Sequence, residues 1–157
     1  MDVQILAGSA SDRDHLKEIV DVLKELGISY DVKIISAHRN PQELMNLVKN
    51  SDANVFIAVA GLSAALPGFI SSLTTKPVIG VPISGKVPFD SLLSMVQMPK
   101  GVPVAVVGLD NARNGALLAA RIVSLYNKNV NEKLKEYMKI ENEKALEAGK
   151  RALEDLI

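Results

Sequence analysis

The segment GSASD, which begins at Gly8, combines groups that could hold an anionic ligand. Gly8 lets a ligand approach the backbone closely, and the hydroxyls of Ser9 and Ser11 can add hydrogen bonds to those of a helix start. Ser11 with Asp14 three residues later equally fits a capping box, which would only stabilise the helix. The carboxylate of Asp12 would repel a phosphate, so sugar hydroxyls or a cation suit it better. The pattern alone leaves both interpretations open.

His38 and Arg39 follow a short β-branched segment, residues 32–35, and so stand where a strand is expected to end. Arginine offers a planar fork for a phosphate or carboxylate, and histidine gains and loses a proton near neutral pH. The pair therefore fits acid–base chemistry on an anion. The alternative is that His38 only hydrogen-bonds its own loop. His15, within an expected helix, is predicted to be a solvated surface residue.

Two further loops are rich in small residues. GLSAALPG at 61–68 would admit a ligand close to the backbone, although small residues serve tight helix packing equally well. SGKVPFD at 84–90 fits either a mobile lid or an ordinary surface loop. With only two histidines and no cysteine, we expect no metal site, and we expect no cofactor.

These residues must be positioned by the surrounding elements, and the apolar segments predict an α/β fold. Continuous apolar runs of strand length indicate strands buried on both faces, as in a parallel sheet with helices on both sides. The three loops GSASD, SAHRNP and AGLSAALPG follow strands, so we expect them at one edge of the sheet. The expected strands are residues 3–7, 32–35, 55–60, 77–82 and 102–107, and the expected helices include 16–26, 91–97 and 110–126, with another beginning at Pro41.

Residues 128–157 differ in character from the rest of the chain, with seven basic and seven acidic side chains and no proline. We expect one helix of about 25 residues, which would outreach a domain this small. Such a helix would either lie on its own domain or, as we favour, clasp a neighbouring subunit. We therefore divide the chain into a domain at 1–127 and a helical extension at 128–157.

The overall composition is that of an ordinary folded domain, with 157 residues, 48% hydrophobic and 23% charged. Eighteen basic and eighteen acidic residues cancel, which leaves no global field to attract a nucleic acid. The absence of cysteine excludes disulfides, thiolate metal sites and a cysteine nucleophile. No segment has the roughly 18–20 apolar residues that span a membrane. We expect a cytoplasmic protein without membrane or nucleic-acid partners.

Five segments, GSASD, SAHR, AGLSAALPG, PVIGVP and SLLSMVQMPKGVPVA, resemble the PurE family of purine biosynthesis, in order and over nearly the whole chain. The resemblance implies a three-layer flavodoxin-like domain with a five-stranded parallel sheet. It also implies a homo-octamer with active sites between subunits. The family places a carboxylate on carbon 4 of aminoimidazole ribonucleotide. One branch is a mutase that moves the carboxylate from N5-carboxyaminoimidazole ribonucleotide, which an ATP-dependent synthase could supply, and the other is a carboxylase that uses carbon dioxide directly.

The resemblance also implies a role for each matching position. His38 would be the proton carrier, Arg39 would contact the phosphate, and Ser36 would help to hold the substrate. The other ribotide contacts would be Gly8, Ser9, Ser11 and Asp12, and the residues lining the carboxylate or carbon dioxide pocket would be Ala60, Gly61 and Ser63.

The sequence departs from each branch of the family at a few positions. Ala65 stands where the mutase branch usually has histidine, and Ser63 and Phe69 also resemble the carboxylase branch, as does the segment ALLAARIVSLYNK. Arg39 and Pro67 are mutase-like. We expect a mutase, with direct carboxylation as the alternative.

A non-catalytic nucleotide- or flavin-binding module of the same fold, or a structural oligomer whose site has decayed, is a further alternative. An aromatic content of 4% without tryptophan leaves few rings to stack on a flavin. A phospho-receiver would need several aspartates at the end of the first strand, which ILAGS lacks.

Overall fold

The computed structural model describes residues 1–154 and 156, and it contains a five-stranded sheet in the order β2-β1-β3-β4-β5. All four strand pairs are parallel, as the sequence predicted. The order reverses direction between β1 and β3, which is where doubly wound sheets bind ligands. The strands are β1 (Val3–Ala7), β2 (Tyr30–Ile34), β3 (Val55–Ala60), β4 (Val78–Pro82) and β5 (Ala105–Val106).

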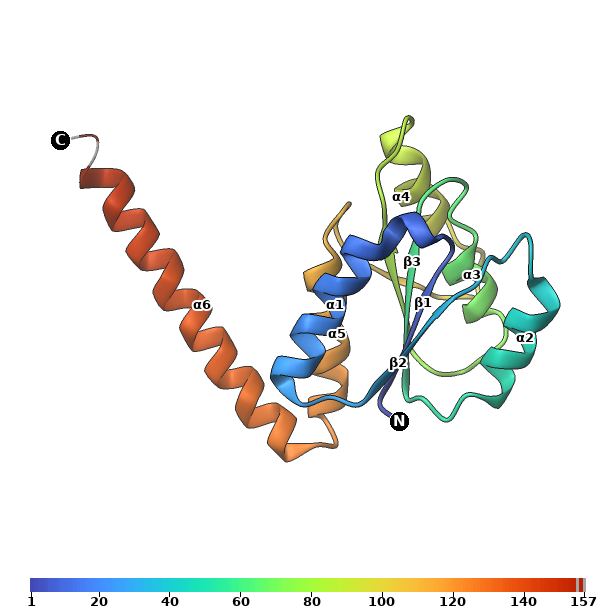
Figure 1. Cartoon of the computed structure of the whole chain (residues 1–157), viewed down its shortest axis with the longest axis horizontal. Helices are drawn as coiled ribbons and strands as arrows, with labels where there is room; N and C mark the ends of the chain where they lie inside the picture. The colour runs from blue at the N-terminus through green and yellow to red at the C-terminus, as the bar shows by residue number, and fades with distance from the viewer. Residues whose placement is uncertain (155, 157) are drawn as a thin grey trace.

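Helices cover both faces of the sheet and complete the three-layer α/β fold (Figure 1). One face carries α1 (Arg13–Leu26) and α5 (Ala112–Ser124), and a single turn of 3-10 helix, Ala10–Asp12, precedes α1. The other face carries α2 (Pro41–Asn50), α3 (Leu66–Ser71) and α4 (Pro88–Val96).

Side chains from the central strands point alternately into two separate cores. Ile5 and Ile57 pack under α1 and α5, whereas Leu6 and Phe56 pack under α2 and α3. All four are fully buried. Because both faces of β1 and β3 are covered, their sequences are continuously apolar, and this is why the runs predicted these strands correctly.

Some element boundaries differ from the sequence-based expectation. β5 has only two residues instead of the six expected at 102–107, and it pairs only with β4 at the edge of the sheet. Pro103, which has no N–H to donate, stands before it. The last three residues of the expected loop 61–68 belong instead to α3 (Leu66–Ser71), whose first turn contains Pro67, a position that proline favours.

The C-terminal helix α6 (Lys128–Glu154) has 27 residues and is about 40 Å long. Its first turns pack against α5 through the buried side chains of Val130, Leu134 and Tyr137. The Nε of Arg113 on α5 donates a hydrogen bond of 2.6 Å to the Tyr137 hydroxyl. The second half of α6 leaves the body of the molecule (Figure 1). The expected arrangement in which residues 128–157 lie on their own domain therefore holds only for the first half of α6.

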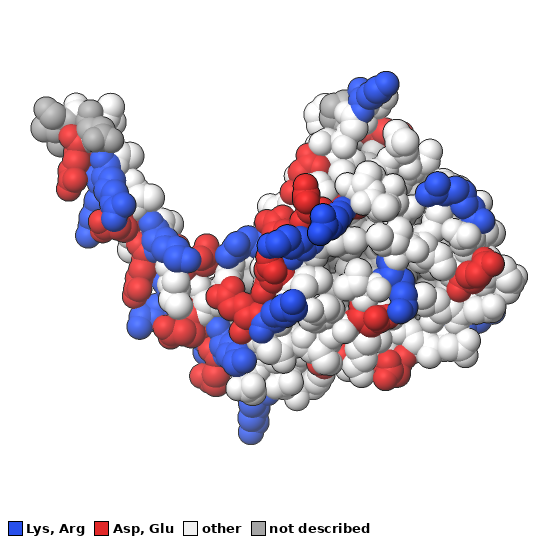
Figure 2. Space-filling model, in the orientation of Figure 1, with Lys and Arg blue, Asp and Glu red and all other residues white. Residues whose placement is uncertain are grey.

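Charges of both signs are mixed along α6, whereas much of the body on the same side is uncharged (Figure 2). Among the described residues, no helix is long and apolar enough to cross a membrane.

Candidate active site

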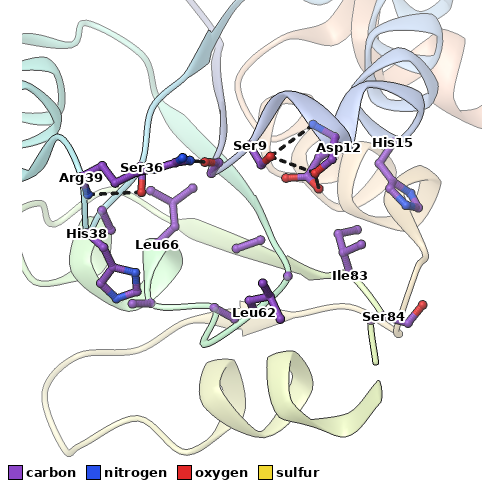
Figure 3. A pocket seen from close by; sticks show the side chains of 18 residues that line it. Ser9, Asp12, His15, Ser36, His38, Arg39, Leu62, Leu66, Ile83 and Ser84 are labelled. Atoms are coloured by element: carbon purple, nitrogen blue, oxygen red, sulfur yellow. Dashed lines mark hydrogen bonds between the residues drawn. The ribbon is translucent and has the colours of Figure 1, made fainter. Parts of the chain in front are cut away.

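A cavity of about 660 Å³ opens at the carboxyl edge of the sheet, where the loops after β1, β2, β3 and β4 meet (Figure 3). The three loops expected at this edge are therefore confirmed as neighbours. Of the ten candidate residues, nine line the cavity: Gly8, Ser9, Ser11, Asp12, Ser36, His38, Arg39, Ala60 and Gly61.

The loop after β1 turns around the Ser9 side chain. Its Oγ accepts hydrogen bonds from the Ser11 N–H at 3.2 Å and from the Ser11 hydroxyl at 2.9 Å. Ser9 thereby caps the 3-10 turn, and the capping box of Ser11 with Asp14 is wrong, because Ser11 lies inside that turn. A Cβ at Gly8 would meet nothing within 4 Å, so protein packing does not require glycine there and the position leaves room for a ligand.

Asp12 is a buried carboxyl group at the cavity wall, with only 7% of the residue exposed. Burial raises the pKa of Asp12, against the opposing influence of hydrogen bonds from Ser11 and Ser9 and of nearby His15. A buried acid with a shifted pKa that faces a cavity is typical of a functional site. Its oxygens can accept hydrogen bonds from sugar hydroxyls.

Arg39 joins the loops after β1 and β2. Its Nη2 donates to the Gly8 carbonyl at 3.2 Å, and its backbone N–H donates to the Ser36 Oγ at 3.3 Å (Figure 3). No carboxylate of the described residues lies within 4.0 Å of the Arg39 guanidinium, whose other donors are available to an anion.

The His38 side chain is exposed and lines the same wall of the cavity. Its ring makes no hydrogen bond with any described residue, so the alternative in which His38 serves its own loop is wrong. Because no described residue occupies its nitrogens, the ring is available to exchange a proton with a ligand.

The loop after β3 contributes backbone and apolar side chains. Ala60 and Gly61 line the cavity, together with Leu62, Ala64, Ala65 and Leu66. Ser63 is the one candidate residue that does not line it: its backbone is left-handed, with φ of 54°, and its N–H donates to Asp90 Oδ2 at 2.9 Å.

His15 was expected to be solvated, but it is half-buried and lines the cavity across from His38 (Figure 3). It follows Asp12 by three residues, about one helical turn, and this spacing was the available signal that both face the same way. Ser84 and Gly85, from the loop that was expected to be either a lid or an ordinary surface loop, also line the cavity, as does Ile83, which was not singled out.

Asp110 fixes the loop after β4 by accepting the Ser84 N–H at 2.8 Å. Slight desolvation raises the pKa of this exposed carboxyl group, but hydrogen bonds from Ser84 and the nearby His15 outweigh it, so the pKa of Asp110 lies below its usual value. Among the residues that the structure describes, no group of three or more histidines and carboxylates could hold a metal ion.

The chain is similar to one protein family and to several of its mutases over most of its length. The model of the AIR carboxylase family matches residues 2–144. N5-carboxyaminoimidazole ribonucleotide mutase of Methanocaldococcus jannaschii is 52% identical over 134 residues, 85% of each chain. The mutase of Pyrococcus horikoshii is 49% identical over 154 residues, 95% of this chain and 87% of that protein.

The crystal structure of Treponema denticola PurE has a similar fold, with a TM-score of 0.85 and 34% sequence identity over 95% of this chain and 96% of that one. The family match spans all four loops that form the cavity. The chain therefore belongs to the AIR carboxylase family, the PurE family that its motifs resemble.

Proposed function

We propose that this protein is an N5-carboxyaminoimidazole ribonucleotide mutase of purine biosynthesis. The observation that carries the proposal is the cavity in which His38, whose ring hydrogen-bonds none of the described residues, stands beside Arg39 and opposite Asp12. Relatives that are 42–52% identical and bear the mutase name support the same assignment.

The ribotide would be held at both its phosphate and its sugar. Arg39 supplies a planar guanidinium with donors left for the phosphate, while Ser9 and Ser11 add hydroxyl groups beside it. Asp12 would accept hydrogen bonds from the ribose hydroxyls. Ser36 holds the backbone of Arg39 and thereby helps to aim the guanidinium.

The reaction moves one carboxylate and one proton in opposite directions. When the N5–carboxylate bond breaks, carbon dioxide leaves and N5 takes up a proton. The electron-rich carbon 4 then attacks carbon dioxide, and its proton must depart for the ring to regain aromaticity. His38 would give the first proton and receive the second, so the imidazole ends as it began. Acid–base help of this kind is commonly worth about 10²- to 10⁴-fold in rate.

Between these steps the enzyme must keep carbon dioxide next to carbon 4. The backbone of Ala60 and Gly61 with the apolar side chains of Leu62 and Leu66 forms a wall suited to a small uncharged molecule. Retention makes the second step effectively intramolecular, an advantage that reaches about 7–11 kcal/mol in well-aligned reactions.

Direct carboxylation of aminoimidazole ribonucleotide is the second candidate function. It is favoured by Ala65, which lines the cavity at the position where the mutase branch carries histidine.

An assay with each of the two substrates separates the candidates. Purified protein is given either N5-carboxyaminoimidazole ribonucleotide, or aminoimidazole ribonucleotide with bicarbonate and no ATP. The proposal predicts efficient formation of 4-carboxy-5-aminoimidazole ribonucleotide only from the first. Efficient turnover of the second alone would identify a carboxylase, and no turnover of either would contradict both.

The assembly and cellular context are part of the same proposal. The exposed second half of α6, with Leu146 and Leu153, would clasp a neighbouring subunit in a homo-octamer. Residues 1–127 would form the catalytic domain. An ATP-dependent reaction would make the substrate upstream, and a cytoplasmic location remains a prediction.

A further inference from the structure

The loop after β3 adopts a backbone conformation that its residues disfavour. Ser63 has φ of 54° and Ala64 has φ of 36°, and neither is glycine. Left-handed conformations of such residues persist only where the surroundings fix them, and they concentrate at functional sites. Of this strained pair Ala64 lines the cavity, as do the neighbouring Leu62 and Ala65, whereas Ser63 stands behind the wall.

Asp90, in the first turn of α4, makes a contact that fixes this loop from outside. Its Oδ2 accepts the Ser63 N–H at 2.9 Å. Inside the loop, the Ala64 N–H lies 2.8 Å from the Gly61 carbonyl oxygen and 2.6 Å from that of Leu62. The Asp90 contact therefore ties the strained turn to α4.

The next residue, Ser91, holds the second loop. It is buried, with 2% exposed, and its hydroxyl donates to the Ile83 carbonyl at 2.8 Å. Ile83 lines the cavity, and its own N–H donates to the Ala60 carbonyl at 3.0 Å. Two consecutive residues of α4 thus hold the loops after β3 and β4, although neither residue lines the cavity.

We propose that Asp90 and Ser91 are positioning residues that hold these two loops closed around released carbon dioxide between the two steps of the reaction. This inference rests on the proposed function. The loops that they hold form the apolar wall, whereas Arg39, Asp12 and His38 stand on the loops after β1 and β2. Loss of the Asp90 or Ser91 contact should therefore increase the loss of carbon dioxide more than it weakens ribotide binding.

The test measures exchange of carbon dioxide during turnover. Unlabelled N5-carboxyaminoimidazole ribonucleotide is converted in ¹³C-bicarbonate with carbonic anhydrase, and mass spectrometry of the early product gives the fraction of its carboxylate that came from solution. A blank without enzyme corrects for spontaneous loss of the carbamate. The variants are Asp90→Ala, Asp90→Asn and Ser91→Ala.

We expect Asp90→Ala to raise the ¹³C fraction about 3- to 10-fold, the size expected for loss of one hydrogen bond of ordinary strength. The KM for the ribotide should change less than 2-fold. Ser91→Ala should act in the same direction. Asp90→Asn should stay within 2-fold of the parent, because an amide oxygen also accepts the Ser63 N–H. The matched control is Asp52→Ala, which removes an exposed carboxylate that also accepts one hydrogen bond, at the N-terminal side of β3.

An unchanged ¹³C fraction in Asp90→Ala would overturn the inference even if kcat fell, and so would an equal increase in Asp90→Asn. Hydrogen exchange of the Ser63 amide supplies a readout that does not depend on activity. It should be slow in the parent and at least 10-fold faster in Asp90→Ala, or in Asp90→Leu, which also lacks an acceptor, should the alanine variant fail to fold. A parent without mutase activity would contradict the proposed function. Equal hydrogen exchange of the Ser63 amide in parent and variant would instead contradict the positioning role of Asp90.

Discussion

His38 is the side chain on which the proposed chemistry depends, and His38→Asn isolates its proton. We expect kcat to fall by about 10²- to 10⁴-fold, because the variant cannot carry a proton between carbon 4 and N5. Ribotide affinity, measured by titration calorimetry, should change less than 3-fold, since the phosphate and sugar contacts remain. The thermal midpoint should also be unchanged, because the ring makes no hydrogen bond with the described residues. Parent-like turnover would show that another group carries the proton.

Arg39 provides the contrast in binding. Arg39→Ala should raise KM about 10- to 100-fold through the loss of charge-assisted hydrogen bonds to the phosphate, with a smaller effect on kcat. The KM of Arg39→Lys should lie between those of the parent and Arg39→Ala, because an ammonium group keeps the charge but lacks the planar fork of the guanidinium. Steady-state kinetics measure both effects. A fall in kcat at unchanged KM would contradict the binding role.

The two aspartates near His15 should respond to pH in opposite directions. Burial raises the pKa of Asp12, so its ionised form opposes folding above its unfolded pKa. Asp12→Asn should therefore stabilise the fold at pH 7, and the gain should disappear as the pH falls below about 4. The same variant should bind the ribotide more weakly, because the amide cannot replace both carboxylate oxygens as an acceptor.

Asp110 is exposed, and its slight desolvation is outweighed by hydrogen bonds from Ser84 with nearby His15, which lower its pKa, so its ionised form stabilises the fold above its unfolded pKa. Asp110→Asn should destabilise the protein at pH 7, and the loss should vanish as the pH falls through the folded pKa. Asparagine tolerates the left-handed φ of 56°, so the variant mainly removes charge. Urea denaturation from pH 3 to pH 8 tests both aspartates, and equal shifts in the same direction would contradict the pKa assignments.

At the scale of elements, close packing of α5 against the sheet depends on Gly115. A Cβ at this position would lie 2.6 Å from Val81 Cγ2 on β4. Gly115→Ala should lower the free energy of unfolding by about 1–3 kcal/mol through overpacking. Gly149→Ala in the exposed half of α6 is the control, because a Cβ there meets nothing within 4 Å and alanine favours a helix. Chemical denaturation measures both effects, and an equal fall in the free energy of unfolding in the two variants would contradict the close packing at Gly115.

The elements that the sequence predicted best are those with a strong local pattern. β1 and β3 were predicted at their observed limits because buried parallel strands are continuously apolar, and α1 ends as expected at Gly27, which has φ of 71°. The limits predicted for β5 were too wide, because an apolar run does not show where hydrogen bonding to the neighbouring strand stops.

The same distinction applies to the site. The loops GSASD and SAHR carried enough polar residue types to be recognised, and the order of strands and helices predicted their meeting at one edge. Asp90 contacts Ser63, 27 positions away, and Asp110 contacts Ser84, 26 positions away. No local spacing in the sequence could predict contacts between residues so far apart. His15 was missed because its charged neighbours in sequence suggested a solvated face.

At the scale of the whole molecule, α6 is the feature that a single chain leaves unexplained. Its second half projects from the body with Leu146 and Leu153 exposed (Figure 1). Deletion of residues 142–157 should reduce the sedimentation mass from the proposed eight times 16.9 kDa to a smaller assembly and lower activity. A parent that sediments as one chain would contradict both the clasp by α6 and an active site shared between subunits.

We propose that His38 exchanges its proton directly with the reacting heterocycle. The most direct measurement is a crystal structure of the protein with 4-carboxy-5-aminoimidazole ribonucleotide bound. We expect an imidazole nitrogen of His38 about 2.6–3.2 Å from carbon 4 or N5, or one water away, with the phosphate on Arg39. A ring turned away from the heterocycle, or a ribotide bound outside this cavity, would show that His38 does not carry the proton.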